Sequence, residues 1–278
     1  MRTDGTPRRT ADGLALTLDV DGSRPLPELT AALDTACDLL EAARPERLVL
    51  LLRLLPAPHH PRSWPGDVDV RAVGRWEKAV HRLERQGALA LAVAAGPCGG
   101  PALDLLLATD FRIAAPDLRL LLPVNDGHFW PGLAVYRLAR QLGGARARQI
   151  VLWGDALGAD RALELGLVDQ VSADVTEAAH TATVLMGRIS DRELAVRRAL
   201  LLEAPSAEYS DAVGAHLAAC DRELRRLAAT TARTTEARPD GAPDVPLEVP
   251  LDGPQDGRPD AGPDGPRDRP SDAPGARP

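Results

Sequence analysis

The sequence has little cysteine, and its three thiols, at Cys37, Cys98 and Cys220, are scattered and odd in number. That pattern excludes the disulfide framework of small secreted domains and is typical of unpaired thiols in a reducing compartment. Lysine is scarcer still, since Lys78 is the only lysine among 33 basic residues. We interpret this scarcity as codon bias toward arginine rather than as a demand of function.

Long apolar runs are also absent. No stretch reaches the roughly 18 consecutive apolar residues of a membrane-spanning helix, and the charged start, MRTDGTPRRTADG, lacks the apolar region of a signal peptide. The net charge of -7 argues against nucleic acid as a partner. The sequence therefore predicts a cytoplasmic protein with no nucleic-acid or membrane partner. Its 278 residues, 44% of them hydrophobic, are enough for one substantial core.

The chain alternates between strand and helix patterns. Residues 47–55 and 88–95 are typical of strands buried on both faces, and 14–20 of a strand that is half buried. Residues 26–43 and 70–85 have the apolar spacing of helices. This alternation predicts an α/β fold with right-handed β-α-β crossovers and a largely parallel sheet.

The most specific stretch is GPCGGPALDLLLATDFRIAA, which begins at Gly96. Gly96, Gly99 and Gly100 give a loop whose backbone can approach another group closely. Pro101 suits the first position of a helix, which we expect over 102–109, because its missing N–H costs nothing there. The stretch therefore predicts a site built between a strand and a helix.

Asp104 is the one charged residue of that helix and lies in its first turn. One interpretation is a carboxylate that complements the helix dipole, which is worth a few tenths to about 1 kcal/mol. The other is a general acid or base whose proton affinity is tuned by an apolar surrounding. The local pattern favours the first and leaves the second open. Cys98, in the same loop, is not expected to be a nucleophile, because no matching histidine base follows from the sequence.

Four further motifs accompany the glycine loop: TDFRIA at 109–114, PG at 131–132, LWG at 152–154 and ALELGLV at 162–168. Together they make the chain resemble the crotonase (enoyl-CoA hydratase/isomerase) superfamily. The resemblance implies a crotonase-like spiral of ββα repeats with C-terminal trimerisation helices, which match the amphipathic patterns at 191–204 and 207–228. It also implies an acyl-CoA substrate, no cofactor apart from the coenzyme A of that substrate, and a homo-oligomer, either trimer or hexamer.

The resemblance also implies an oxyanion hole made by two backbone N–H groups around the thioester carbonyl. An ungapped match places these donors at Pro65 and Pro101, which have no N–H. Losing one such donor costs about 10² to 10³ in rate. A shift of one residue would instead offer Gly66, and Gly100 or Ala102, as donors. The expected oxyanion and substrate loop comprises Pro65, Gly66, Gly99, Gly100 and Pro101.

Hydratases of this family carry two catalytic glutamates, one to activate water and one to deliver a proton to carbon. The resemblance places the first at Asp104, one methylene shorter, and the second at Val124. Asp126 is the nearest acidic candidate for the second role, although a turn carboxylate in the Asn-Asp-Gly sequence is the favoured alternative. The catalytic residues expected from the resemblance are thus Asp104 and Asp126.

The residues that follow Asp126 are bulkier than their counterparts in the family, where the acyl pocket is lined by smaller side chains. His128, Phe129 and Trp130 are therefore expected to line that pocket. Their bulk either fills the pocket or shapes it for an aromatic or polyketide-like acyl group. Trp153, on a later helix, is interpreted as a core residue.

Histidine and arginine offer two further patterns. The pair His59-His60 lies in a proline-rich loop with no second cluster of ligands at a useful spacing, so no metal site is expected.

Several arginines remain candidates to meet the phosphates of a nucleotide-like ligand, although a solvated basic face is favoured for any one of them. These are Arg112, Arg137, Arg140, Arg146 and Arg148.

Composition divides the chain into four parts. We expect a disordered lead at 1–12, a crotonase-like core at 13–188, a C-terminal helical segment at 189–230 and a disordered tail at 231–278. The tail is rich in Pro, Gly, Asp and Arg and has almost nothing to bury.

A narrower resemblance rests on GPCGGPALDLLLATDFRI, LLPVNDGHFWPGLAVYRL, RRALLLEAPS and GAHLAACDRELRRL. These segments are similar to the crotonase-like proteins of dihydroxyphenylglycine biosynthesis in glycopeptide-antibiotic producers. That similarity implies a role beside a type III polyketide synthase in forming 3,5-dihydroxyphenylacetyl-CoA, by dehydration and aromatisation of a CoA-bound polyketide intermediate. The alternative is a catalytically impaired crotonase fold that acts as a non-enzymatic partner of the synthase.

Overall fold

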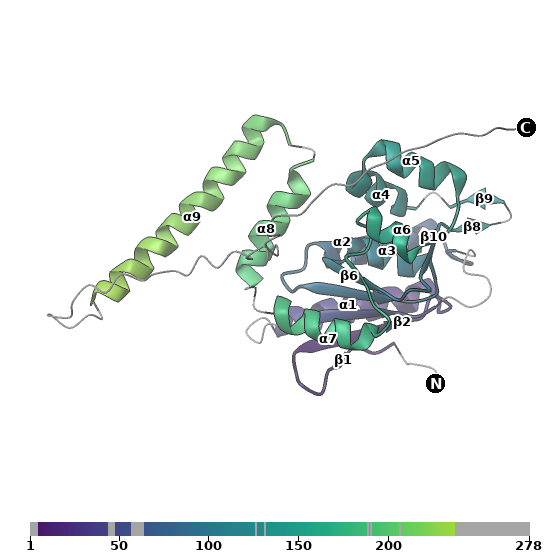
Figure 1. Ribbon diagram of the computed structural model, residues 1–278, viewed down its shortest axis with the longest axis horizontal. Coiled ribbons are helices and arrows are strands. Elements are labelled where there is room, and N and C mark those ends of the chain that lie inside the picture. The colour runs from purple at the N-terminus through teal and green to yellow at the C-terminus, as the bar shows by residue number, and fades with distance from the viewer. Residues whose placement is uncertain are drawn as a thin grey trace, which may run out of the picture. The chain divides into compact units, whose positions relative to one another are not determined.

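The computed structural model describes residues 5–43, 48–56, 64–125, 127–130, 132–187, 189, 191–205 and 207–236 (Figure 1). The chain divides into two units, Met1–Leu224 and Arg225–Pro278, and the features that follow belong to the first, except that the last helix continues past Leu224. None of the helices in the described ranges is long and apolar enough to cross a membrane.

Within the described residues, six strands form the main sheet in the order β1-β2-β3-β4-β6-β11. All pairings from β2 to β11 are parallel, and only β1 pairs in the antiparallel sense. The prediction of a largely parallel sheet is therefore confirmed. The strands are β1 Arg8–Arg9, β2 Ala15–Val20, β3 Val49–Leu54, β4 Ala90–Ala94, β6 Phe111–Ala114 and β11 Gln170–Val171.

Helices cover both faces of this sheet, and the alternation of side chains along each strand divides the apolar residues between two cores. The larger core joins Leu16 and Leu18 to the buried sides of several helices, and the smaller core joins Ala15 to α7. In α1, the predicted stripe of Leu29, Leu33 and its neighbours is buried. The helices are α1 Leu26–Ala42, α2 Val70–Glu84, α3 Pro101–Ala108 and α7 Val175–Met186.

A second, smaller sheet and a hairpin carry the loops near α3. The small sheet has the order β10-β7-β5, with β5 at Pro97–Gly99, β7 at Arg119–Leu121 and β10 at Leu157–Gly158. The hairpin pairs β8, Val124–Asn125, with β9, His128–Phe129. The remaining helices are α4 Ala134–Leu142, α5 Gly144–Trp153, α6 Ala159–Glu164, α8 Asp191–Glu203 and α9 Tyr209–Glu236.

The N-terminal edge differs from the sequence prediction. Part of the expected lead forms β1, and β2 is buried along nearly its whole length rather than half buried. The polar position of β2 that was expected to be exposed is Asp19. Its side chain is buried, and Arg8 Nη2 and Arg53 Nη2 donate to its Oδ2 at 3.0 and 2.7 Å. At the other end, α9 extends to Glu236, six residues into the expected tail, whose remainder lies outside the described residues.

Candidate active site

The site begins where the glycine loop turns into α3. Gly100 has φ 55° and ψ -126°, in a region that favours glycine, and it is the last residue before the helix. Pro101 then occupies the first helical position, as expected. The Asp104 backbone N–H donates to the Gly100 carbonyl at 3.1 Å. All eight residues of α3 are buried, so the Asp104 carboxylate lies in an apolar surrounding with only 4% of the residue exposed.

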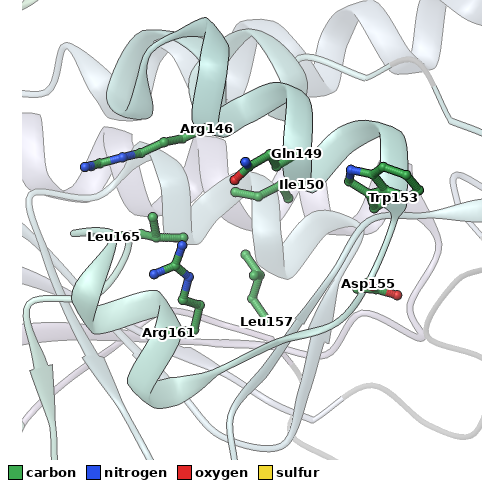
Figure 2. A pocket seen from close by; sticks show the side chains of 8 residues that line it. All are labelled: Arg146, Gln149, Ile150, Trp153, Asp155, Leu157, Arg161 and Leu165. Carbon is green, nitrogen blue, oxygen red and sulfur yellow. The ribbon is translucent and has the colours of Figure 1, made fainter.

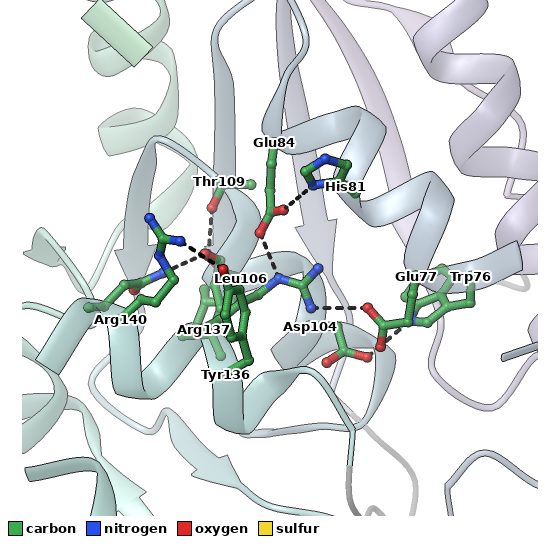
Figure 3. Close-up of polar contacts among 12 residues, drawn as sticks. Trp76, Glu77, His81, Glu84, Asp104, Leu106, Thr109, Tyr136, Arg137 and Arg140 are labelled. Atoms are coloured by element: carbon green, nitrogen blue, oxygen red, sulfur yellow. Dashed lines mark hydrogen bonds and ion pairs between the residues drawn. The ribbon is translucent and has the colours of Figure 1, made fainter. Parts of the chain in front are cut away.

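Asp104 is held by a tryptophan from the neighbouring helix. Trp76 Nε1, on α2, donates to Asp104 Oδ2 at 2.9 Å, and Trp76 is itself 1% exposed (Figure 3). The indole has no other polar atom, so it is a donor only. The contact stabilises the carboxylate form of Asp104 and fixes the orientation of its side chain.

A buried ion-pair cluster lies beside this pair. Arg137, on α4, is 4% exposed; its Nε donates to Glu84 Oε1 at 2.7 Å, and its Nη1 to Glu77 Oε2 at 3.2 Å (Figure 3). Glu77 and Glu84 are seven residues apart on α2, so they lie two turns apart on one face. One guanidinium therefore meets two carboxylates close to a third, that of Asp104.

These surroundings raise the pKa of Asp104 to about 7. Burial is the main cause, and the negative charge of Glu77 adds to it; the Trp76 hydrogen bond and the Arg137 charge oppose the shift, and Glu84 reinforces it. A carboxyl group with this pKa holds or releases a proton near neutral pH. That property suits general acid–base catalysis.

The two predicted halves of the oxyanion loop meet at Trp64. Its buried ring lies against Gly100, where a side-chain Cβ would come within 3.3 Å of the Trp64 Cγ atom. The same ring packs edge-on against Trp76, with the ring centroids 6.0 Å apart. Pro65 and Gly66 follow directly. The structure thus brings both proline-containing loops to the side of α3 that carries Asp104.

The acyl-pocket candidates are placed on and after the hairpin. His128 and Phe129 are exposed on β9, and Trp130 is half buried. A Cβ on Gly132 would come within 2.8 Å of Trp130 Nε1, so the indole lies tightly against the turn before α4. Val124 is on β8, and Asp126 lies outside the described residues.

Three of the arginines named as candidates for phosphate contacts are engaged with other groups of the chain. Arg137 is buried in its cluster. Arg112 donates to the carbonyl oxygens of Leu107 and Thr109, at the end of α3. The interpretation of these two as a basic face is wrong, because helix packing encloses them. Arg140 is also engaged, with the carbonyl of Leu202 and the hydroxyl of Tyr136.

The expectation that Trp153 is a core residue is also wrong. It is 76% exposed, because Ala147 is the only residue of α5 that is buried. Cys98, in contrast, is buried, and burial raises the pKa of its thiol to about 12. Burial and the raised pKa both disfavour the thiolate form that a nucleophile needs.

No group of three or more His, Cys, Asp or Glu side chains that could hold a metal ion occurs in the part of the chain that the structure describes. The His59-His60 pair lies outside that part.

Sequence reasoning missed Glu77, Glu84 and the structural role of Arg137. The only local signal was the seven-residue spacing of the two glutamates on one face of an amphipathic helix. Their partner is 53 residues further along the chain than Glu84, so no local pattern connects them.

Comparison with known proteins identifies the family. The family model described as enoyl-CoA hydratase/isomerase matches residues 75–236. An enoyl-CoA-hydratase of Amycolatopsis orientalis is 43% identical over 216 residues, which cover 77% of this chain and 98% of the relative.

Solved structures show the same fold at low sequence identity. An enoyl-CoA hydratase of Mycobacterium smegmatis superposes with TM-score 0.69 at 18% identity, covering 86% of this chain and 99% of that one. An enoyl-CoA hydratase/isomerase of Cupriavidus metallidurans CH34 gives TM-score 0.68 at 20% identity, covering 88% and 100%. A putative enoyl-CoA hydratase of Thermobifida fusca YX, solved in complex with CoA, gives TM-score 0.63 at 17% identity, covering 81% of this chain and 95% of that one. The α/β crotonase fold predicted from the motifs is confirmed, and the chain belongs to the enoyl-CoA hydratase/isomerase family.

Proposed function

We propose that this protein removes water from a CoA-bound polyketide intermediate, with Asp104 as the general acid–base group. The acyl-CoA substrate is supported by the family and by the CoA bound to the Thermobifida relative. The proposal extends to a role beside a type III polyketide synthase in forming 3,5-dihydroxyphenylacetyl-CoA. The narrower sequence resemblance supports that role, and the likeness to an Amycolatopsis relative accords with it.

The observation that carries the proposal is the Asp104 carboxyl beside the glycine loop, with its pKa raised to about 7 by burial and by Glu77. A strongly shifted carboxyl group that is also oriented by a specific donor, Trp76, is typical of functional sites. A carboxylate serving only the helix dipole would gain nothing from enclosure, because burial penalises the charge.

The proton balance of the reaction needs one such group. Loss of water from a 3-hydroxyacyl thioester breaks the C2–H bond and the C3–O bond. Asp104, as the carboxylate, takes the C2 proton and then delivers it to the hydroxide that leaves C3, which completes a water molecule and regenerates the carboxylate. Neither an oxidant nor a reductant is required.

Other residues of the chain would support this step. Trp76 keeps Asp104 Oδ2 in place, so that Oδ1 can face the substrate, and Arg137 limits the rise in the pKa of Asp104. Pro101 offers no N–H to the thioester oxygen, so we assign the oxyanion donors to neighbouring residues, Gly66 and either Gly100 or Ala102. Asp126 remains a candidate for a helper role.

A matched pair of variants tests the proposal in the full-length protein. Asp104→Asn should keep the fold and lower hydration of crotonyl-CoA, or synthase-coupled product formation, by about 10² to 10⁴. Asp160→Asn is the control, since Asp160 is also acidic and in a first helical turn, but is exposed on α6. Equal activity of both variants would rule out Asp104 as the acid–base group.

A second function is favoured by the enclosure of the site. Asp104 is almost inaccessible, Trp64 lies over Gly100, and Pro101 lacks the N–H that the ungapped match requires. A crotonase fold with an impaired site could instead act as a binding partner of the synthase. In that case Asp104→Asn would leave the stimulation of the synthase intact, and Pro101→Gly, which restores the missing N–H, would produce a gain in crotonyl-CoA hydration.

Assembly as a trimer or hexamer is part of the proposal. Leu201, on α8, and Leu217 and Leu224, on α9, are exposed in the single chain. These apolar side chains support the idea that the two helices pack against other copies. Light scattering at micromolar concentration should give a multiple of three chains, and a monomer would contradict it.

A further inference from the structure

A hollow of about 280 Å³ lies between α5 and α6 (Figure 2). Its floor is apolar and is formed by Ile150, Leu157 and Leu165. One wall is the exposed ring of Trp153. This hollow is not part of the site around Asp104, and neither the family nor the proposed function assigns it a role.

The exposed ring is positioned by the way α5 ends. Gly154 has φ 67°, and its N–H donates to the Ile150 carbonyl at 3.0 Å. That left-handed turn ends the helix, and Asp155 and Leu157, which follow it, also line the hollow. The indole therefore stands at one end of a depression rather than on a flat surface.

Charges are arranged along the hollow in a definite order. Arg146 and Arg161 lie toward one end, and Trp153 and Asp155 toward the other (Figure 2). Within the described ranges, Arg146 and Asp155 have no hydrogen-bond or ion-pair partner. Arg161 Nη1 donates to Glu164 Oε2 at 2.6 Å, and a guanidinium has further N–H groups to offer.

We propose that this hollow binds a single-ring aromatic carboxylate that carries phenolic hydroxyl groups. The carboxylate pairs with Arg146 and Arg161, which can contact both of its oxygens. The ring lies against the indole of Trp153. Asp155 accepts a hydrogen bond from a hydroxyl group at the far end.

Size and charge favour this class over others. Ligand pockets begin at about 300 Å³, so a hollow of about 280 Å³ suits one ring rather than a nucleotide. A plain hydrocarbon would leave Arg146 and Asp155 without partners, and a cation would meet two guanidinium groups.

The test measures binding of 3,5-dihydroxyphenylacetate to the full-length protein by calorimetry. We expect saturable binding of one molecule per chain. Arg146→Gln, Arg161→Gln and Trp153→Leu should each weaken it about fivefold, which corresponds to about 1 kcal/mol. Cyclohexylacetate, which has no aromatic ring, should bind more weakly by a similar factor.

Arg148→Gln is the matched control, because Arg148 is on the same helix but does not line this hollow; with Leu152 it lines a second hollow, which shares only Gln149 and Trp153 with the first. It should leave binding unchanged. No saturation up to about 10 mM, tenfold above the Kd of about 1 mM that corresponds to about −4 kcal/mol, would overturn the proposal. A loss of affinity in Arg148→Gln as large as that in Arg146→Gln would also overturn it. If Trp153→Asp dissociates an oligomer, the surface is a contact between copies and the proposal is wrong.

Discussion

Trp76 and Trp153 occupy opposite extremes of the same fold. Trp76 is 1% exposed and donates to Asp104, whereas Trp153 is 76% exposed and faces an open hollow. Both are tryptophans on helices, Trp76 in the middle of α2 and Trp153 at the last residue of α5. What separates them is the number of elements that cover their helix: α2 is enclosed by α1 and α3, whereas α5 is covered along a single narrow stripe.

The difference shows what enclosure does to polar groups. Around Trp76 it forces carboxylates and a guanidinium into fixed pairs and raises the pKa of Asp104. Around Trp153 the same kinds of side chain remain hydrated and available to a ligand. Stability should therefore depend strongly on the first region and weakly on the second.

The largest effect is expected for Arg137→Gln. Removing the guanidinium leaves Glu77 and Glu84 without their buried partner, and breaking a buried pair costs about 3 to 5 kcal/mol. Chemical denaturation would measure the loss. Arg161→Gln is the control from the exposed region and should cost less than about 1 kcal/mol. Equal losses of unfolding free energy in the two variants would contradict the contrast between the enclosed and the exposed region.

A pH dependence of stability comes next. The folded pKa of Asp104, about 7, lies above its ordinary value of 3.8, so the folded chain binds the extra proton between these limits. Stability should therefore fall as pH rises from about 4 to about 7 and level off above that. Asp104→Asn should remove this part of the slope. If the unfolding free energies of the two proteins differ by the same amount at every pH, the pKa of Asp104 is ordinary.

Trp76→Phe should have a smaller cost. It leaves Asp104 Oδ2 without a donor, and an unsatisfied buried acceptor costs about 1 to 3 kcal/mol. It should also raise the pKa of Asp104 further, since the indole stabilises the charged form. Denaturation at two pH values would separate these effects, and a lower pKa in the variant would argue against the hydrogen bond.

The smallest effect is expected for Trp153→Phe. An exposed side chain away from special backbone features changes stability by no more than about 0.5 kcal/mol. Thermal unfolding of the two Trp→Phe variants side by side would sharpen the contrast. A large loss at Trp153 would mean that the ring is covered in the assembled protein.

The sequence predicted the scaffold well because strand and helix patterns are local. The stripe of Leu29 and Leu33, the glycine turn at Gly100 and Pro101 at the start of α3 all follow from spacing and backbone chemistry. The family motifs added the crotonase fold. The site was predictable only in part, since Asp104 was identified by its place in an apolar helix.

The rest of the site depends on contacts between distant segments. Arg137 could not be distinguished from a surface arginine, because its partners come from α2, 53 and 60 residues away. Trp153 could not be recognised as exposed, because its apolar neighbours in the sequence resemble those of a buried helix. The burial of both depends on which helices pack against them, and a local pattern does not specify that.

Cys98 offers a way to time motions of the glycine loop. Its thiol is buried, its pKa is raised to about 12, and it lies directly before Gly99 and Gly100. A disulfide reagent added to the folded protein reacts with such a group only when the loop departs from the structure described, so the rate of labelling counts those departures. If an acyl-CoA substrate enters only when the loop opens, adding acyl-CoA should change the labelling rate of Cys98. If the site never opens, the labelling rate should be the same with and without acyl-CoA.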